Sequence, residues 1–224
     1  MGLVFGFDDG RPDFNLLYYL TNLLKFIIIS FIILLIYYRI QKFFAHRLGA
    51  TIKITLWQAK NLKIPFKKKK IQFPLWIIIP LLISFLSRGQ IYFATVLSTE
   101  LIANPAQRLG RKHIHLTLFE KAKVLVPAPI ILILIALLLN PISFLKDIAT
   151  VSLMISVFSM LPFPGLAGSE IFFGSKPIYI FSLVFILIIA LLLNLLSSTT
   201  TLAIAIICGL VALITYLYRF YKKR

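Results

Sequence analysis

The sequence predicts an all-α polytopic membrane protein with about six transmembrane helices and a small β insertion. Three observations lead to this fold class. The chain of 224 residues is 60% hydrophobic, with a mean hydropathy of +0.95. Only 14% of its residues are charged, whereas a soluble domain has about 25% charged residues. Most of its apolar residues stand in runs of about 20, the length that crosses roughly 30 Å of hydrocarbon.

The net charge of the chain is +17, which in a soluble protein favours a nucleic-acid partner. Here the basic residues stand at the ends of apolar runs and in one loop, without a nucleic-acid-binding motif. Basic residues in such places face anionic headgroups and set the orientation of the helices. We therefore expect membrane lipids and no nucleic acid as partners of a multi-pass integral protein, in the plasma membrane of a prokaryote.

The N-terminal region, 1–73, combines one span with a basic interfacial region. The expected span is Leu16 to Tyr38, with tyrosines at both ends and Lys25 near one end of its apolar core. In 51–56, Ile and Leu alternate with Thr and Lys, which is typical of a half-buried strand or an interfacial ribbon. A solvated loop that binds anionic headgroups is expected at four consecutive lysines: Lys67, Lys68, Lys69 and Lys70.

The second expected span, Pro74 to Leu97, carries polar residues inside its apolar sequence. These candidate intramembrane polar residues are Ser87, Arg88 and Gln90. An arginine at this depth is costly unless it is paired, near a water-filled cavity or close to the surface. A functional site and an interfacial position both remain open for Arg88.

Residues 100–123 are too polar to span a membrane. Alternation in 112–118 predicts a strand, with 108–111 as its turn. The third expected span is Val124 to Asn140, where two prolines near the start suit a distorted first turn.

The fourth expected span, Ile148 to Phe173, contains the stretch SMLPFPGLAGSEIF, whose prolines and glycines break or kink a helix. The fifth and sixth, Pro177 to Leu196 and Thr199 to Tyr218, form an antiparallel hairpin within a C-terminal region, 175–224. The topology conflicts with the charges. If the loop after the first span is cytoplasmic, six crossings put the basic C-terminal tail on the opposite side.

The stretch at 159–172 resembles the motif N-x-x-P-x-x-x-L-D-G of the site-2 protease family of intramembrane zinc metallopeptidases. Pro162, Leu166 and Gly168 match this motif, whereas Ser159 stands at its Asn position and Ala167 at its Asp position. The sequence EIFFG that follows is similar to the family's continuation after the glycine.

A second resemblance lies upstream, in 119–137. There the family has an acidic residue ahead of an Ala-Gly-Pro that opens the next span, and this chain has Pro127-Ala128-Pro129. The expected β element is also similar to the family's strand insertion between membrane helices. The resemblance implies a site-2-protease-like core over 74–174, in which the Pro-rich break opens a helix near the membrane boundary.

The metal-binding and catalytic residues of that family are missing from this chain. Its zinc is held by two His of H-E-x-x-H and by the Asp of L-D-G, and the Glu activates water. This chain has no H-E-x-x-H, and Ala167 replaces the Asp. The resemblance therefore implies a pseudoprotease, with no catalytic residue and no expected cofactor, zinc included.

Two other sets of residues offer weaker alternatives. His113 and His115 share one face of the expected strand and would chelate a metal with Glu100 or Glu120, although a pair that faces headgroups is the simpler interpretation. Glu170 either pairs with an arginine of the second span or faces the interface.

These observations favour a catalytically inactive, site-2-protease-like integral membrane protein that binds membrane-protein segments or scaffolds a membrane complex. Two alternatives stay open. One is an active intramembrane metallopeptidase with atypical ligands. The other is an unrelated small channel or transporter component, in which the polar residues of the second span and Glu170 line a water-filled path.

Overall fold

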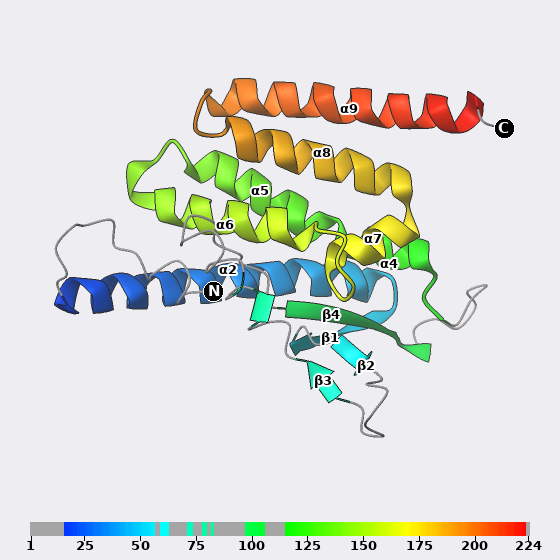
Figure 1. Cartoon of the computed structure of the whole chain (residues 1–224), viewed down its shortest axis with the longest axis horizontal. Coiled ribbons are helices and arrows are strands. Elements are labelled where there is room, and N and C mark those ends of the chain that lie inside the picture. Colours follow the sequence, from blue (N-terminus) through cyan, green and yellow to red (C-terminus); the bar gives the residue numbers. More distant parts are fainter. Residues whose placement is uncertain are drawn as a thin grey trace.

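The computed structural model describes residues 16–56, 59–62, 71–73, 78–79, 82, 97–105 and 115–222. Most of these residues are helical, and the long helices lie beside one another in a layered bundle (Figure 1). The described elements are α2 (Leu16–Arg47), β1 (Ala50–Leu56), β2 (Ala59–Leu62), β3 (Ile71–Phe73), β4 (Leu97–Ala103), α4 (Leu118–Leu125), α5 (Pro127–Leu139), the 3-10 turn η2 (Ser143–Leu145), α6 (Lys146–Ser159), α7 (Ala167–Gly174), α8 (Lys176–Leu192) and α9 (Ser198–Lys222).

Three helical segments of the described chain are long and apolar enough to cross a membrane: α2, the α4–α5 pair and α9. The helical class expected from the composition is therefore confirmed at this coarser level. The expected fourth and fifth spans are shorter than the sequence suggests, because α6 has 14 residues and α8 has 17. The first is longer, and its 32 residues extend about 48 Å, which exceeds the roughly 30 Å of a hydrocarbon core.

α5 forms the centre of the bundle. Its Leu132 packs with Ile33 of α2 and Val151 of α6 in one apolar cluster. Its Ile133 belongs to a second cluster that includes Ile186 of α8. The outer helices α2 and α9 instead keep most of their apolar surface exposed, which suits contact with lipid.

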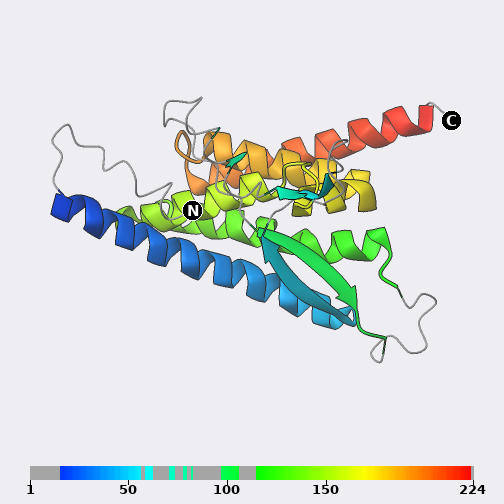
Figure 2. The same ribbon diagram turned by 60° about the horizontal axis from the view of Figure 1, so that its bottom comes forward.

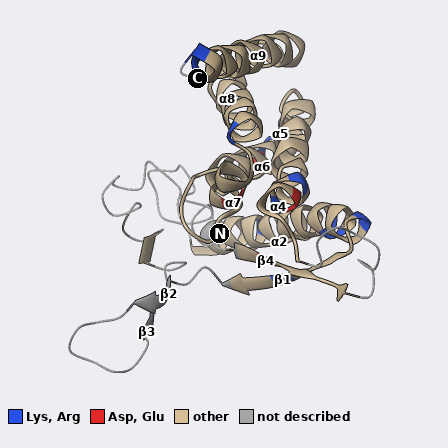
Figure 3. Ribbon diagram, turned by 90° about the vertical axis from the view of Figure 1, so that its right-hand side faces the viewer, with Lys and Arg blue, Asp and Glu red and all other residues tan. Residues whose placement is uncertain are grey.

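The helices alternate in direction, so several of their basic ends meet at one end of the bundle. The C-terminal ends of α2 and α9 and the first turns of α4 and α8 all lie there (Figures 1 and 3). The described lysines and arginines at this basic end are Arg39, Lys42, Arg47, Lys121, Lys123, Lys176, Arg219 and Lys222. α2 and α9 thus end at the same end of the described bundle, which fits basic residues on one side of a membrane.

A two-stranded antiparallel ribbon, β1–β4, lies against the basic end (Figure 2). Its register runs from Ala50 opposite Ala103 to Leu56 opposite Leu97. β1 confirms the strand predicted from the alternation in 51–56. Within the described chain, neither β1 nor β4 pairs with a third strand. β2 and β3 form a separate short pair.

The strand predicted at 112–118 is wrong for its described residues. Thr117 caps α4: its hydroxyl accepts a hydrogen bond from the Glu120 amide at 3.2 Å, and its own amide donates to the Glu120 carboxylate at 3.0 Å. This capping box fixes the start of a helix at Leu118. The rest of the predicted strand, 112–114, lies outside the described residues, and a described strand lies earlier in this region, at Leu97–Ala103.

The predicted C-terminal hairpin is confirmed. α8 and α9 lie antiparallel, joined by residues 193–197 (Figure 1). Gly209 lets them approach closely, since a Cβ there would lie 3.0 Å from the ring of Phe181. The connection is tied to α5, because the Ser198 hydroxyl donates to the Leu137 carbonyl at 3.0 Å.

Candidate functional site

The site predicted from the family motif is the break between α6 and α7. α6 ends at Ser159 and α7 begins at Ala167. Pro164 and Gly165 form a tight turn closed by a 3.0 Å hydrogen bond from the Leu166 amide to the Phe163 carbonyl. Gly165 has a φ of 89°, a conformation that glycine adopts without strain, and Pro-Gly is the usual pair at such turns. The local sequence therefore specifies this break.

Two glycines, Gly168 of the motif and Gly174 at the end of α7, hold α7 against its neighbours. A Cβ on Gly168 would lie 2.2 Å from the Met160 carbonyl oxygen and 2.5 Å from that of Leu161. A Cβ on Gly174 would lie 2.3 Å from the carbonyl oxygen of Leu118, in the first turn of α4. Both contacts are with backbone atoms, which cannot rotate away as a side chain does. The glycines thus seat α7 between the break and α4.

The other motif positions are structural as well. The buried hydroxyl of Ser159 donates to the Ser156 carbonyl at 2.8 Å. Leu166 is buried at the start of α7, and its carbonyl accepts a 2.9 Å hydrogen bond from the Ser169 hydroxyl. Pro162 is exposed in the break. From α8, the Tyr179 hydroxyl donates to the Met160 carbonyl at 3.2 Å, which gives the interrupted backbone a partner.

Ala167 occupies the position at which the resembled family has its Asp. The side chain is 6% exposed and belongs to the main apolar cluster. A methyl group offers no lone pair to a metal and no group for proton transfer. At this position the chain can supply packing only.

Glu170 is the one described acidic residue of α7, and it lies partly buried at the basic end of the bundle. Its Oε2 atom is buried and has no hydrogen-bond partner among the described residues. Burial raises the pKa of this carboxyl above its ordinary value of 4.5. The positive charge of Lys121 in α4 opposes that change, and the negative charge of Glu100 in β4 adds to it. The charges of Lys121 in α4 and Glu100 in β4 therefore both influence the protonation of Glu170 in α7.

Sequence analysis missed a second polar group, on α2. The Tyr37 hydroxyl lies close to the side chains of Ser159 and Gln41. Gln41 is fully buried on the same helix, one turn after Tyr37. The three side chains form a buried polar group where α2 meets the end of α6. Gln41 could have indicated this polar group in the sequence. The expected first span, however, ended at Tyr38, just before the basic residues begin at Arg39.

Several predicted site residues lie outside the described residues: Ser87, Arg88, Gln90, His113, Lys67, Lys68, Lys69 and Lys70. His115 is described and lies exposed ahead of α4. Within the described part of the chain, no group of three His, Cys, Asp or Glu side chains could hold a metal ion. The site that the structure does bring together is the break, Ala167, Glu170 and the open ribbon.

Comparison with protein-family models gives no match. Comparison with curated proteins and comparison with solved structures also give no match.

Proposed function

We propose that this protein is a multi-pass integral membrane protein with a site-2-protease-like core that does not cut peptides and instead binds segments of other membrane proteins, holding them in a membrane complex. The observation that carries the proposal is the contrast between Gly168 and Ala167. Gly168 keeps the helix break closed to within backbone contact of Met160, whereas its neighbour presents only a methyl group. A tightly packed helix break at the position of the motif, without a metal ligand at Ala167, supports a non-catalytic role.

The β1–β4 ribbon supports a role in binding extended segments. Both strands have an edge that no described strand covers, and an extended peptide adds to such an edge through main-chain hydrogen bonds. The charge of Glu100 in β4 contributes to raising the pKa of Glu170 in α7, which supports treating the ribbon and the break as one region. The Glu170 carboxyl, whose Oε2 atom has no hydrogen-bond partner among the described residues, favours a client with a basic residue beside its membrane span.

The membrane location and its orientation rest on the helices and the charges. Three helices are long and apolar enough to cross a bilayer, and α2 and α9 expose apolar surface to their surroundings. Lysines and arginines gather where α2 and α9 end, and positive residues favour the cytoplasmic side. The proposal therefore puts the break and the ribbon on the cytoplasmic side of the membrane.

Binding of a defined client tests the proposal. The full-length protein is reconstituted in lipid nanodiscs and titrated with a synthetic peptide that has one apolar span and an extended basic flank. A photo-reactive residue at Ile102, which is half exposed on β4, should cross-link the flank. The same residue at Leu138, exposed at the other end of the bundle, serves as the control. A peptide whose flank carries N-methylated amides cannot add to a strand and should bind much more weakly.

Zinc content and cleavage of the same peptide separate this proposal from the alternatives. Near one equivalent of zinc together with cleavage would establish an active metallopeptidase. Equal cross-linking at Ile102 and Leu138, or equal binding of the N-methylated peptide, would refute strand addition. Solute flux in liposomes without peptide binding would favour a channel or transporter component.

A further inference from the structure

The first turn of α8 and the last two turns of α9 enclose a surface cavity of about 270 Å³. It is lined by Lys176, Pro177, Tyr216, Leu217, Phe220 and Tyr221. The lining combines one ammonium group and two phenol hydroxyls with aromatic and aliphatic surface, and none of the described lining residues is acidic. Such a set of groups matches a ligand that has an anionic, hydrogen-bonding head and an apolar body.

The charge around the cavity is positive. Lys176 forms no ion pair with any described carboxylate, and its ammonium lies 5.9 Å from the centre of the Phe172 ring. Arg219 and Lys222 stand in the last turn of α9 beside the cavity. Viewed along the bundle, basic residues colour both the end of α9 and the start of α8 (Figure 3). An anion is therefore drawn to this corner and meets an unpaired cation there.

The cavity also lies at a definite depth. It is at the end of α9, one of the helices long and apolar enough to cross a membrane. Tyrosines and basic side chains at the end of a span are typical of the headgroup level, where one part of the residue is apolar and the other is wet. Tyr216 and Phe220 stack with their ring centres 6.4 Å apart. The two rings give the cavity an apolar wall, which suits the glycerol and upper acyl part of a lipid molecule.

We propose that this cavity binds the headgroup of an anionic phospholipid, with its phosphate next to the Lys176 ammonium and the hydroxyls of Tyr216 and Tyr221. The inference rests on the proposed membrane location. It adds a specific lipid site at Lys176 to the basic end of the bundle. A bound lipid here would join the α8–α9 hairpin to the bilayer at the same end as the helix break.

Native mass spectrometry of the delipidated, full-length protein tests the site. Phosphatidylglycerol and phosphatidylcholine are added separately, with and without excess inorganic phosphate. The variants are Lys176→Gln, Lys176→Arg and, as a matched control at the other end of the bundle, Lys146→Gln, which also removes an exposed lysine. We expect phosphatidylglycerol to be retained in preference to phosphatidylcholine. Lys176→Gln should weaken its retention about fivefold, the effect of one basic side chain near an anionic surface. Lys176→Arg and Lys146→Gln should change it little.

Three results would overturn the proposal. Unchanged phosphatidylglycerol retention in Lys176→Gln would remove the cavity as its site. An equal loss in Lys146→Gln would reduce the effect to net charge. Displacement of the lipid by inorganic phosphate would assign the cavity to free phosphate instead. Extraction of cell membranes with alkaline carbonate reports membrane insertion separately, so a failure of the membrane location can be told apart from a failure of the lipid site.

Discussion

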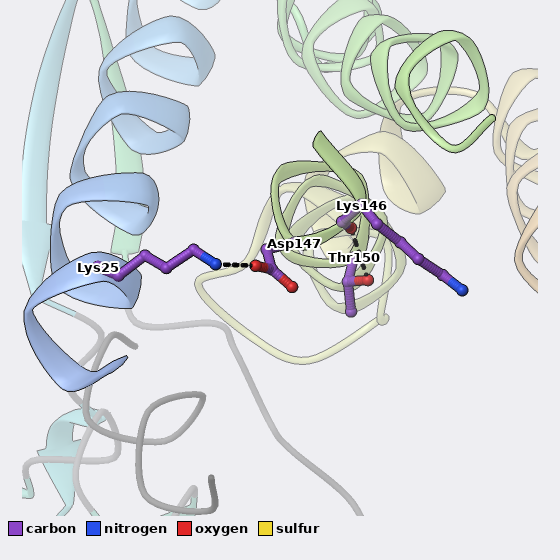
Figure 4. Close-up of polar contacts among 4 residues, drawn as sticks. All are labelled: Lys25, Lys146, Asp147 and Thr150. Carbon is purple, nitrogen blue, oxygen red and sulfur yellow. Dashed lines mark hydrogen bonds and ion pairs between the residues drawn. The ribbon is translucent and has the colours of Figure 1, made fainter. Parts of the chain in front are cut away.

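The ammonium group of Lys25 in α2 forms an ion pair with the carboxylate of Asp147 in the first turn of α6 (Figure 4). It links two helices whose residues are 122 positions apart in sequence. The carboxylate also stands at the N-terminal end of α6, where the helix dipole favours a negative charge. Lys146, the next residue, points away from the pair (Figure 4). The pair therefore fixes α2 to α6 at the end of the bundle opposite the break.

Removal of either partner of this pair should lower the stability of the folded protein. We expect Lys25→Ala and Asp147→Ala each to destabilise it, and their double-mutant cycle to give a coupling of about 0.2–1 kcal/mol, because both side chains are partly exposed. Thermal unfolding of the purified protein in detergent measures the effect. Lys146→Ala is the matched control, and coupling between Lys146 and Lys25 of the same size would contradict a specific pair.

Gly168→Ala should disrupt the helix break. The new methyl group would lie 2.2 Å from the Met160 carbonyl oxygen, so the backbone of α7 must move. We expect a loss of at least about 2 kcal/mol, the range of overpacking in a tight core. Gly209→Ala is the comparison, because its Cβ would meet the Phe181 ring at 3.0 Å, and a ring can shift. Unfolding midpoints that rank Gly209→Ala below Gly168→Ala in stability would show that the break is loosely packed.

Glu170→Gln should remove a pH dependence of stability. Burial raises the pKa of Glu170 in the folded protein above its ordinary value of 4.5, so the folded state holds this proton more tightly than the unfolded chain. The resulting stability is fully present below pH 4.5 and is lost as the pH rises through the folded pKa.

Thermal melts of the wild type and of Glu170→Gln across this range check the prediction. The amide copies the neutral acid, so the two proteins should melt alike at low pH, and the variant should melt higher at neutral pH. A wild type that is more stable than the variant at neutral pH would mean that the carboxylate gains more from Lys121 than it loses by burial.

Ala167→Asp should not restore a metal site. The new carboxylate would replace a side chain that is 6% exposed, inside the apolar cluster. An unpaired buried charge is strongly destabilising, and we expect a loss of about 3 kcal/mol or more at neutral pH. Elemental analysis of the purified variant should find less than about a tenth of an equivalent of zinc, because the other two family ligands are absent from the sequence. Stoichiometric zinc with unchanged stability would contradict this expectation.

The sequence by itself determined the features that neighbouring residues encode. Apolar runs of span length made α2 and α9 helical, since a backbone in an apolar environment must satisfy its own hydrogen bonds. The alternation in 51–56 specified β1, and Pro164-Gly165 specified the turn that separates α6 from α7. Each of these depends on the φ and ψ preferences or the partitioning of a few adjacent residues. All three could therefore be read without knowledge of the rest of the chain.

Only the tertiary structure decided which distant groups meet. β4 is a strand because it pairs with β1, and its own residues, LSTELIA, carry no clear alternation. Residues 115–118 were expected to belong to a strand, whereas the structure caps a helix there and packs α4 against Gly174. The raised pKa of Glu170 and the ion pair of Lys25 with Asp147 likewise depend on neighbours from other elements. Burial and electrostatic contact are set by register and packing across the chain, so local sequence preferences cannot specify them.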